Sequence, residues 1–350
     1  MTPNFFFTDW EGPWAVTDFA YEAAIAFLNN QEFFERLSQY DDYLAYVKKK
    51  ENYEAGDTLK LLAPFLVAAN VTSRDLEELS SKVASFVPDA EGAMAALSPY
   101  RAVVISTAYK QFLEVAAGMI GVNGDLWGTE FTPESYDVGE DEKENVLKAV
   151  DVIASLPEIE VKPGMGMEDL DEGSRESVEW LDRFFWDELM KTPFKKVLED
   201  VNAIGGGRKQ KIVQSYVEKH GIEEIIAIGD SISDHAMLQW VKDKGGIAVS
   251  FNGNEFAIRH ANVAVISNTA FAEAAVVDLF MKEGVEGVIK LAKSFEKQSL
   301  KDSKIAPEIV QRLLDSEVRI YWLEDVDVNA VLEESKKMRR LLRGEAGKLG

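Results

Sequence analysis

Residues 225–234 read Ile225-Ile226-Ala227-Ile228-Gly229-Asp230-Ser231-Ile232-Ser233-Asp234, an apolar run that leads into two acids. The apolar half is typical of a buried strand, and the residues that follow, to Lys244, have a helical pattern. Asp230 and Asp234 therefore bracket a strand-to-helix turn. Carboxylate oxygens around a small open site are ligands that suit Mg²⁺. This stretch predicts a strand whose end carries a magnesium site.

Other short apolar runs predict the remaining strands: 4–8, 102–106, 247–251, 263–266 and, more weakly, 126–132. Helical patterns lie between them, and strands that alternate with helices favour an α/β fold with an open parallel sheet. Asp9, Ser106 and Asp230 each stand at the end of an apolar strand. Because ligands bind at the carboxyl edge of such sheets, we expect these side chains to share one site.

The first strand ends in Thr8-Asp9-Trp10-Glu11-Gly12, with two carboxylates two residues apart. One of them can act as a nucleophile and the other as a general acid and base. Taken alone, a strand that ends in solvated acids is the commoner interpretation. Ser106 is followed by Thr107, and a hydroxyl here could bind a phosphoryl oxygen or could simply cap a helix.

Lys209 opens a predicted helix, 209–219, directly after Gly205-Gly206-Gly207. The helix dipole disfavours a lysine at this end, so an anion nearby would compensate. Lys211 and Arg208 are competing choices for the same role, and an ordinary exposed lysine is the plain alternative.

Composition narrows the classes of function. The 350 residues include 61 acidic and 38 basic ones, a formal charge of −23, which repels nucleic acid. Any anionic substrate would need a local positive site against that background. The chain has no cysteine, which excludes thiolate metal sites and cysteine nucleophiles and fits a reducing, cytoplasmic setting. No apolar window is long enough to predict a membrane span.

Together, the segments around Asp9, Ser106, Lys209 and Asp230 resemble the four ordered motifs of the haloacid dehalogenase (HAD) superfamily. Lys209 lies twelve residues before Gly221, a spacing usual in that family. The segment from Gln111 to Thr132 is similar to phosphoserine-phosphatase-like members. Asp9-Trp10-Glu11-Gly12-Pro13 resembles archaeal members, some of which carry the name energy-converting hydrogenase A subunit R.

The resemblance implies a role for each residue. Asp9 would attack phosphorus and ligate Mg²⁺, and Glu11 would protonate the leaving group while its backbone carbonyl binds the metal. Ser106 and Lys209 would hold the phosphoryl oxygens. Asp230 would ligate Mg²⁺, with Asp234 completing the shell directly or through water.

This sequence departs from the family pattern in three places. Glu11 stands where Asp is usual, Pro13 replaces a small or β-branched residue, and the insertion at 135–204 is larger than phosphoserine phosphatases carry. The size of that insertion argues against transferring their substrate to this chain.

The implied architecture is a Rossmann-like parallel sheet with a helical cap inserted after the first strand and further helical additions. We expect a HAD-like core from 1–14, 99–134 and 205–284, a cap at 15–98, a helical insertion at 135–204 and a helical extension at 285–350. Aromatic residues of the cap could line a pocket, although most are expected to form the cap's own core: Phe19, Tyr21, Phe27, Phe33 and Phe34.

The implied activity is Mg²⁺-dependent hydrolysis of a small phosphorylated metabolite through an aspartyl-phosphate. A phosphotransferase and a non-catalytic accessory subunit, bound to a protein partner such as a hydrogenase complex through the helical additions, remain as alternatives. Basic residues near the C-terminus are expected to form a solvated helix face or to dock on the acidic body, with a membrane-surface role as a third option: Lys336, Lys337, Arg339, Arg340 and Arg343.

Overall fold

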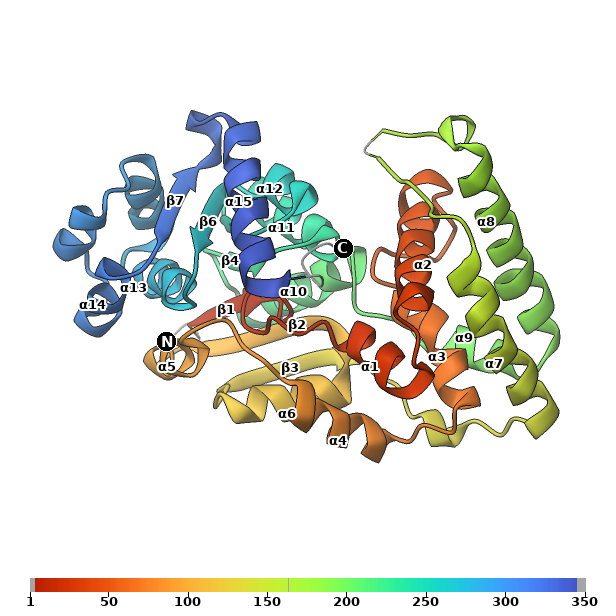
Figure 1. The fold of residues 1–350 in the computed structure, drawn as a ribbon. Coiled ribbons are helices and arrows are strands. Elements are labelled where there is room, and N and C mark those ends of the chain that lie inside the picture. Colours follow the sequence, from red (N-terminus) through yellow and green to blue (C-terminus); the bar gives the residue numbers. More distant parts are fainter. Residues whose placement is uncertain (1–3, 163, 345–350) are drawn as a thin grey trace.

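The computed structural model describes residues 4–162 and 164–344. Its centre is a seven-stranded sheet in the order β3-β2-β1-β4-β5-β6-β7 (Figure 1). The strands are β1 (Phe5–Thr8), β2 (Arg101–Tyr109), β3 (Gly124–Thr129), β4 (Ile226–Gly229), β5 (Ile247–Phe251), β6 (Val263–Ser267) and β7 (Val318–Trp322). All neighbours pair in parallel except β6 and β7. The predicted α/β fold with a mostly parallel, Rossmann-like sheet is confirmed.

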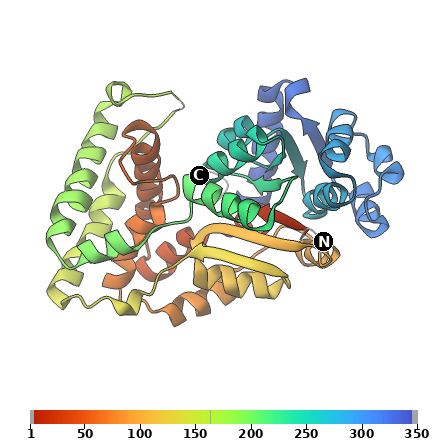
Figure 2. The same cartoon turned by 180° about the vertical axis from the view of Figure 1, so that it is seen from behind.

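Alternate residues of β1 face opposite sides of the sheet, as the period of two in a strand requires. Phe5 and Phe7 pack into a core that includes side chains of α10 (Gly207–His220), α11 (His235–Asp243), α12 (Glu255–His260) and α15 (Val328–Arg343). Phe6 packs on the other side, into a core with α6 (Lys110–Met119) and α13 (Phe271–Lys293). Both faces of β1 are therefore covered, which explains its uninterrupted apolar run; Figure 2 shows the first face from behind, with α10 in green.

A second body of helices stands beside the carboxyl edge of the sheet (Figure 1), and we call it the helical lobe. It combines α1 (Phe19–Leu28), α2 (Gln31–Asp42) and α3 (Thr58–Ala68) with α7 (Glu140–Ser155), α8 (Glu172–Arg183) and α9 (Phe194–Asp200). Helix α7 packs against α2 and α3, and α9 packs against α3. The stretches 15–98 and 135–204, which the sequence suggested as two additions, thus contribute to one lobe.

Two helices of the 15–98 stretch pack against helices that flank the sheet. Helix α4 (Ser73–Val83) packs against α6, and α5 (Ala90–Ala96) packs against α13. The side chains of Thr72 and Asp75 form a reciprocal capping box at the start of α4.

The last part of the chain is not wholly helical, contrary to the prediction for 285–350. Between α14 (Pro307–Leu314) and α15, β7 adds an antiparallel edge strand to β6. Val318, Ile320 and Trp322 are buried in alternation with exposed Arg319 and half-buried Tyr321, so a strand pattern was present in the sequence. Residues 345–350 of this extension lie outside the described residues.

Short helical turns complete the described structure: Tyr43–Val47, Pro133–Ser135, Met167–Asp169, Phe184–Glu188, Leu189–Lys191, Ile232–Asp234, Lys297–Asp302 and Leu323–Asp325. Among the described residues, no helix combines the length and apolarity needed to cross a membrane.

Candidate active site

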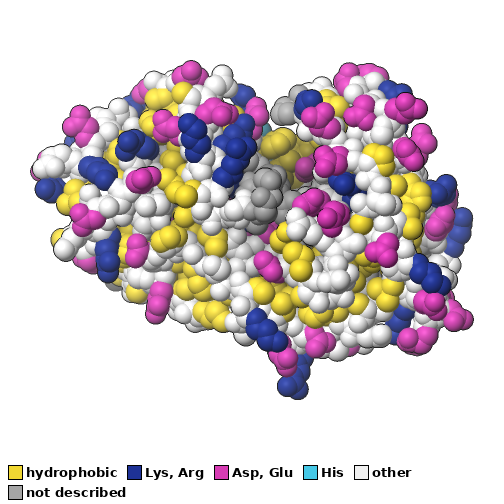
Figure 3. All heavy atoms as spheres, viewed as in Figure 1, with side chains coloured by type: hydrophobic (Ala, Val, Ile, Leu, Met, Phe, Trp, Pro, Cys, Tyr) yellow, Lys and Arg dark blue, Asp and Glu magenta, His cyan; other side chains and the backbone are white. Residues whose placement is uncertain are grey.

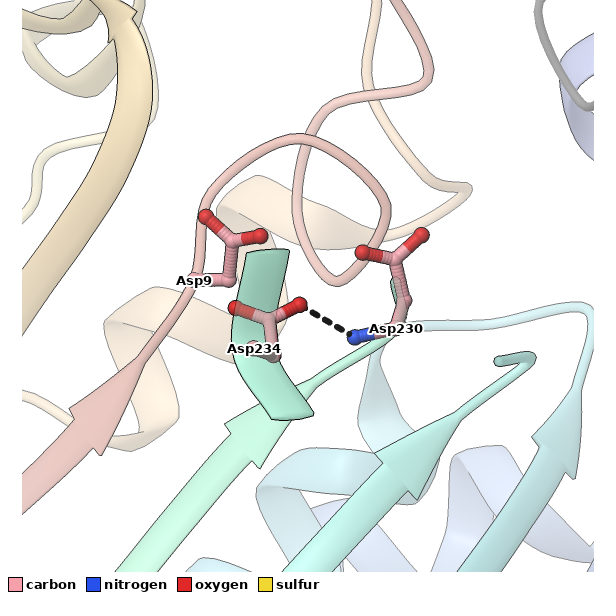
Figure 4. Close-up of side chains that lie close together, drawn as sticks. All are labelled: Asp9, Asp230 and Asp234. Atoms are coloured by element: carbon pink, nitrogen blue, oxygen red, sulfur yellow. Dashed lines mark hydrogen bonds between the residues drawn. The ribbon is translucent and has the colours of Figure 1, made fainter. Parts of the chain in front are cut away.

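The sheet brings Asp9 and Asp230 together, because each follows one of two neighbouring parallel strands. Thr8 of β1 is in register with Ile228 of β4, and the backbone N–H of Asp9 donates to the carbonyl of Ile228 over 2.9 Å. Asp234 lies one turn further along, in the short helix after β4 (Figure 4). One carboxylate oxygen from each of the three acids lies within 4.8 Å of the others.

Lys209 contacts two acids of this cluster. It is fully buried in the first turn of α10, and its Nζ lies 2.8 Å from Asp9 Oδ1 and 2.7 Å from Asp234 Oδ1. Burial alone would lower the pKa of Lys209, but the carboxylates of Asp234 and Asp9 outweigh it and raise the pKa. Of the competing choices, Lys211 is exposed, and Arg208 pairs instead with Asp57 of the lobe over 2.5 Å.

Asp234 is held by the protein at both oxygens. Its Oδ1 accepts from Lys209, and its Oδ2 accepts the backbone N–H groups of Asp230 and Ser231, each at 3.0 Å. Gly229 makes this turn possible, since a Cβ there would lie 2.5 Å from Asp234 Cβ. In this structure Asp234 anchors the turn and Lys209, which leaves Asp9 and Asp230 as the carboxylates with room for another partner.

Asp230 has a counter-ion that the sequence did not single out. Its Oδ2 pairs with Arg339 and, at 3.2 Å, with Arg343, both from α15. Its Oδ1 is buried and has no hydrogen-bond partner. Burial raises the pKa of Asp230, while Arg339 and Arg343 oppose that shift. Of the basic C-terminal residues, Arg339 and Arg343 therefore dock on an acidic site of the body, whereas Lys337 and Arg340 are exposed on the helix, so two of the options that the sequence left open each hold for part of the set.

The sequence feature that could have pointed to these arginines is their spacing along the helix. Val331, Ser335, Arg339 and Arg343 follow each other at intervals of four and so lie on one face of α15. Three of them are buried side chains of that helix in the structure. No feature of the sequence could name Asp230 as the group they meet, since that contact spans more than 100 residues.

The loop after β1 passes directly over Asp230. Gly12 has φ of 115°, and a Cβ on it would lie 2.2 Å from Asp230 Cγ. The carboxylate of Glu11 turns toward the lobe, where its Oε1 accepts the backbone N–H of Phe19, at the start of α1, over 2.7 Å. Burial, and then the charge of Asp18, raise the pKa of Glu11 to about 8.

The structure separates the two hydroxyls that the sequence left as alternatives. Ser106 is fully buried, and its Oγ accepts the backbone N–H of Ala108 over 3.1 Å. Thr107, not Ser106, lines the cavity that contains Asp9, although its own Oγ1 donates to the carbonyl of Ile204.

This cavity has a volume of about 100 Å³ and lies between the sheet edge and the helical lobe. The core contributes Asp9, Glu11, Thr107, Ser231, Ile232 and Ser233, and α15 contributes Arg339 and Arg343. From the stretch 15–98 come Asp18, Ala20, Phe34, Ser38, Asp41, Asp42, Gly56, Thr58 and Leu59. Of the aromatic residues proposed for the pocket, Phe34 lines it, whereas Phe19 and Phe33 are fully buried in the core.

The residues at this edge fit a divalent cation. All three acids offer oxygen, the ligand that Mg²⁺ prefers, and the unpartnered, buried Oδ1 of Asp230 is the kind of atom a cation would satisfy. Burial and the neighbouring charge of Asp234 raise the pKa of Asp9 well above its usual range, with only partial compensation by Lys209. A cation between Asp9 and Asp230 would relieve this repulsion.

Comparison with known proteins gives a match over nearly the whole chain. The structure is similar to that of gene product AF1437 from Archaeoglobus fulgidus, with 44% sequence identity, a TM-score of 0.84 and coverage of 99% of this chain and 98% of that one. No protein-family model matches the chain, and no curated protein matches it.

More distant matches include a HAD family hydrolase from Salmonella enterica serovar Typhi, with 10% identity, a TM-score of 0.44 and coverage of 75% and 67% of the two chains. Another is a phosphoserine phosphatase in its apo form, with 12% identity, a TM-score of 0.42 and coverage of 75% and 92%. Matches this distant carry no argument about chemistry. The predicted HAD-like arrangement is supported instead by where the structure places Asp9, Lys209, Asp230 and Asp234.

Proposed function

The chain belongs to the same family as gene product AF1437 of Archaeoglobus fulgidus, and we propose that it is a Mg²⁺-dependent phosphomonoesterase that uses Asp9 as its nucleophile. The observation that carries the proposal is the setting of Asp9. Asp9 lines a small cavity, and its Oδ1 is held by Lys209 and by the backbone N–H of Trp10 at 2.7 Å. Asp230, whose Oδ1 has no hydrogen-bond partner, belongs to the same carboxylate cluster.

The proposed reaction follows from what these groups can do. An oxygen of Asp9 attacks phosphorus in line, the bond from phosphorus to the substrate oxygen breaks, and the leaving alkoxide takes a proton from Glu11. Water, deprotonated by Glu11, then attacks phosphorus and releases Asp9 and phosphate. Lys209 stays charged throughout and stabilises the phosphoryl oxygens, whose charge spreads in the transition state.

Asp9 and Asp230 would hold the cation, which supplies charge neutralisation for the phosphoryl group next to the carboxylates. We propose Mg²⁺ because the cluster contains only carboxylate oxygens, without the imidazole or thiolate ligands that zinc prefers. The small cavity favours a small phosphorylated metabolite over a macromolecule.

The first experiment measures phosphate release from p-nitrophenyl phosphate and from a panel of phosphorylated metabolites, with Mg²⁺ and with excess EDTA. Asp9→Asn should lose activity on the order of 10⁴-fold or more, the scale on which removal of a covalent nucleophile acts. Asp137→Asn is the matched control, because Asp137 is exposed and lies in the loop before α7.

The outcomes separate the alternatives. Full activity of Asp9→Asn, or unchanged hydrolysis in EDTA, contradicts the mechanism. Transfer of phosphate to an added alcohol in preference to water identifies a phosphotransferase. A wild-type protein that neither hydrolyses any of these esters nor binds beryllofluoride with Mg²⁺ points to the non-catalytic subunit.

A further inference from the structure

Helix α15 is fixed against the turn that carries Asp230. The hydroxyl of Ser335 donates to the carbonyl of Gly253 over 2.7 Å, and this bond is buried. The next residue in the same loop, Asn254, donates its backbone N–H to the carbonyl of Asp230 over 2.8 Å. The C-terminal helix and the residue after β4 are thus both hydrogen-bonded to one loop.

Arg339 contacts two groups of Asp230. Its Nη1 contacts the carboxylate at Oδ2 and also donates to the backbone carbonyl of Asp230 over 3.2 Å. Both side chains are almost fully buried, with 4% of Arg339 and 1% of Asp230 exposed. Because Arg339 contacts both the carboxylate and the backbone carbonyl of Asp230, it restricts rotation of the Asp230 side chain. A contact to the carboxylate alone would not do so.

Arg343, one turn later, connects the same carboxylate to the helical lobe. Its Nη1 lies 3.2 Å from Asp230 Oδ2, and its Nε donates to the carbonyl of Val16 over 3.3 Å. Val16 lies in the segment that leads from the loop over Asp230 into α1, and its N–H bonds to Ser85 on the returning segment. Arg343 therefore links the acid to the connection between sheet and lobe.

These contacts leave one carboxylate oxygen of Asp230 without a partner. Oδ2 is taken by the two arginines, Gly12 covers the carboxylate, and Oδ1 is the atom without a partner. We propose that Arg339 and Arg343 are positioning residues of the active site, which hold Asp230 so that Oδ1 faces the cation between it and Asp9. The inference rests on the proposed function, and it makes the C-terminal helix part of the catalytic unit.

Groups that orient a metal ligand without touching the metal act on metal affinity, and their loss commonly costs about 10- to 100-fold. Calorimetry with Mg²⁺ alone, without substrate, measures this on Arg339→Gln. Arg340→Gln is the matched control, because Arg340 is the adjacent residue of α15 and is exposed. We expect Arg339→Gln to bind Mg²⁺ at least about tenfold more weakly than the control.

Arg339→Lys keeps the charge but has a shorter side chain without the planar guanidinium, so it should recover only part of the affinity. If Arg339→Gln does not fold, Arg343→Gln takes its place, since it removes a single contact to Asp230. In either variant, the apparent KM for Mg²⁺ in the hydrolysis assay should rise while the KM for the ester stays close to that of Arg340→Gln.

Two failures are distinguishable. If the wild-type protein binds no Mg²⁺, the proposed function falls and this inference falls with it. If wild-type, Arg340→Gln and Arg339→Gln bind Mg²⁺ within twofold of each other, or if Arg339→Gln binds it more tightly, only the positioning role is overturned.

Discussion

Replacing Lys209 by methionine tests whether the buried ion pairs hold the site together. Lys209 is fully buried, and its Nζ is shared by Asp9 and Asp234. Methionine has a similar length but no charge, so the change removes both ion pairs and leaves two buried carboxylates without their common partner. We expect a large loss of stability and only a small change in packing volume.

The size of the effect follows from the opposing terms. Each unit-charge pair is worth about 4 kcal/mol at 4 Å for an effective dielectric constant of 20, so two pairs contribute about 8 kcal/mol. Burying the ammonium group of Lys209 costs several kcal/mol in the wild type. The methionine variant does not incur this cost, which offsets part of the loss. The difference agrees with the roughly 3–5 kcal/mol usually lost when one partner of a buried pair is removed.

Thermal unfolding in EDTA, followed by tryptophan fluorescence, measures this loss. At about 1.4 °C for each kcal/mol in a chain of this size, Lys209→Met should melt at least about 4 °C below the wild type. Lys211→Met is the control, since Lys211 is exposed on the same helix and its replacement should change stability by less than about 0.5 kcal/mol. Added Mg²⁺ should recover part of the loss. Equal melting temperatures for the two variants would refute the reasoning.

Two further predictions concern the loop over Asp230 and the helical lobe. Gly12→Ala places a Cβ 2.2 Å from Asp230 Cγ at a φ of 115°, so it should weaken Mg²⁺ binding in calorimetry and lower Tm, whereas Gly118→Ala, with open space around it in α6, should not. Burial raises the pKa of Asp42 to about 7, so this acid binds its proton more tightly in the folded protein than in the unfolded one. Its contribution to stability is present below the unfolded value near 4 and is lost as the pH rises through about 7; Asp42→Asn should therefore raise Tm at pH 8 and leave it nearly unchanged at pH 4, and an equal shift at both pH values would contradict this.

Much of the fold was predictable because the strands carry a strong local signal. Parallel strands buried on both faces read as continuous apolar runs, and 247–251 coincides with β5 as observed. Their carboxyl ends meet at one edge, so the strand pattern alone is enough to expect that Asp9 and Asp230, which follow separate strands, lie close together. The preference for Lys209 over Lys211 rested on its resemblance to the family, and the structure places Lys209 against Asp9.

What the sequence did not reveal depends on contacts between distant segments. Arg339 and Arg343 lie on a helix whose pattern is that of any amphipathic surface helix, and the group they meet is more than 100 residues away. Helix α7 packs against α2 and α3 in one lobe. Local periodicity shows that each helix has an apolar face but does not show which other face it packs against. The short strand β7 was missed because its five residues alternate weakly within a charged, helix-like region.

The charges at the site bear on how a protein of charge −23 would receive the phosphate ester that we propose as its substrate. Figure 3 shows acidic side chains spread over the sheet domain and the helical lobe, with a group of basic side chains over α15. Within the described site, three carboxylates (Asp9, Asp230 and Asp234) are paired with three cations (Lys209, Arg339 and Arg343). The charges of these six groups thus balance one another before any ligand enters, and four further acids line the same cavity: Glu11, Asp18, Asp41 and Asp42. A phosphoryl dianion adds two negative charges and Mg²⁺ adds two positive ones, so the two ligands together preserve that balance while either one alone disturbs it. Without the two arginines the same carboxylates would carry an excess of two negative charges, which would oppose the ester on arrival. The C-terminal helix therefore places two positive charges at this acidic site, and under the proposed function they would favour an anionic substrate.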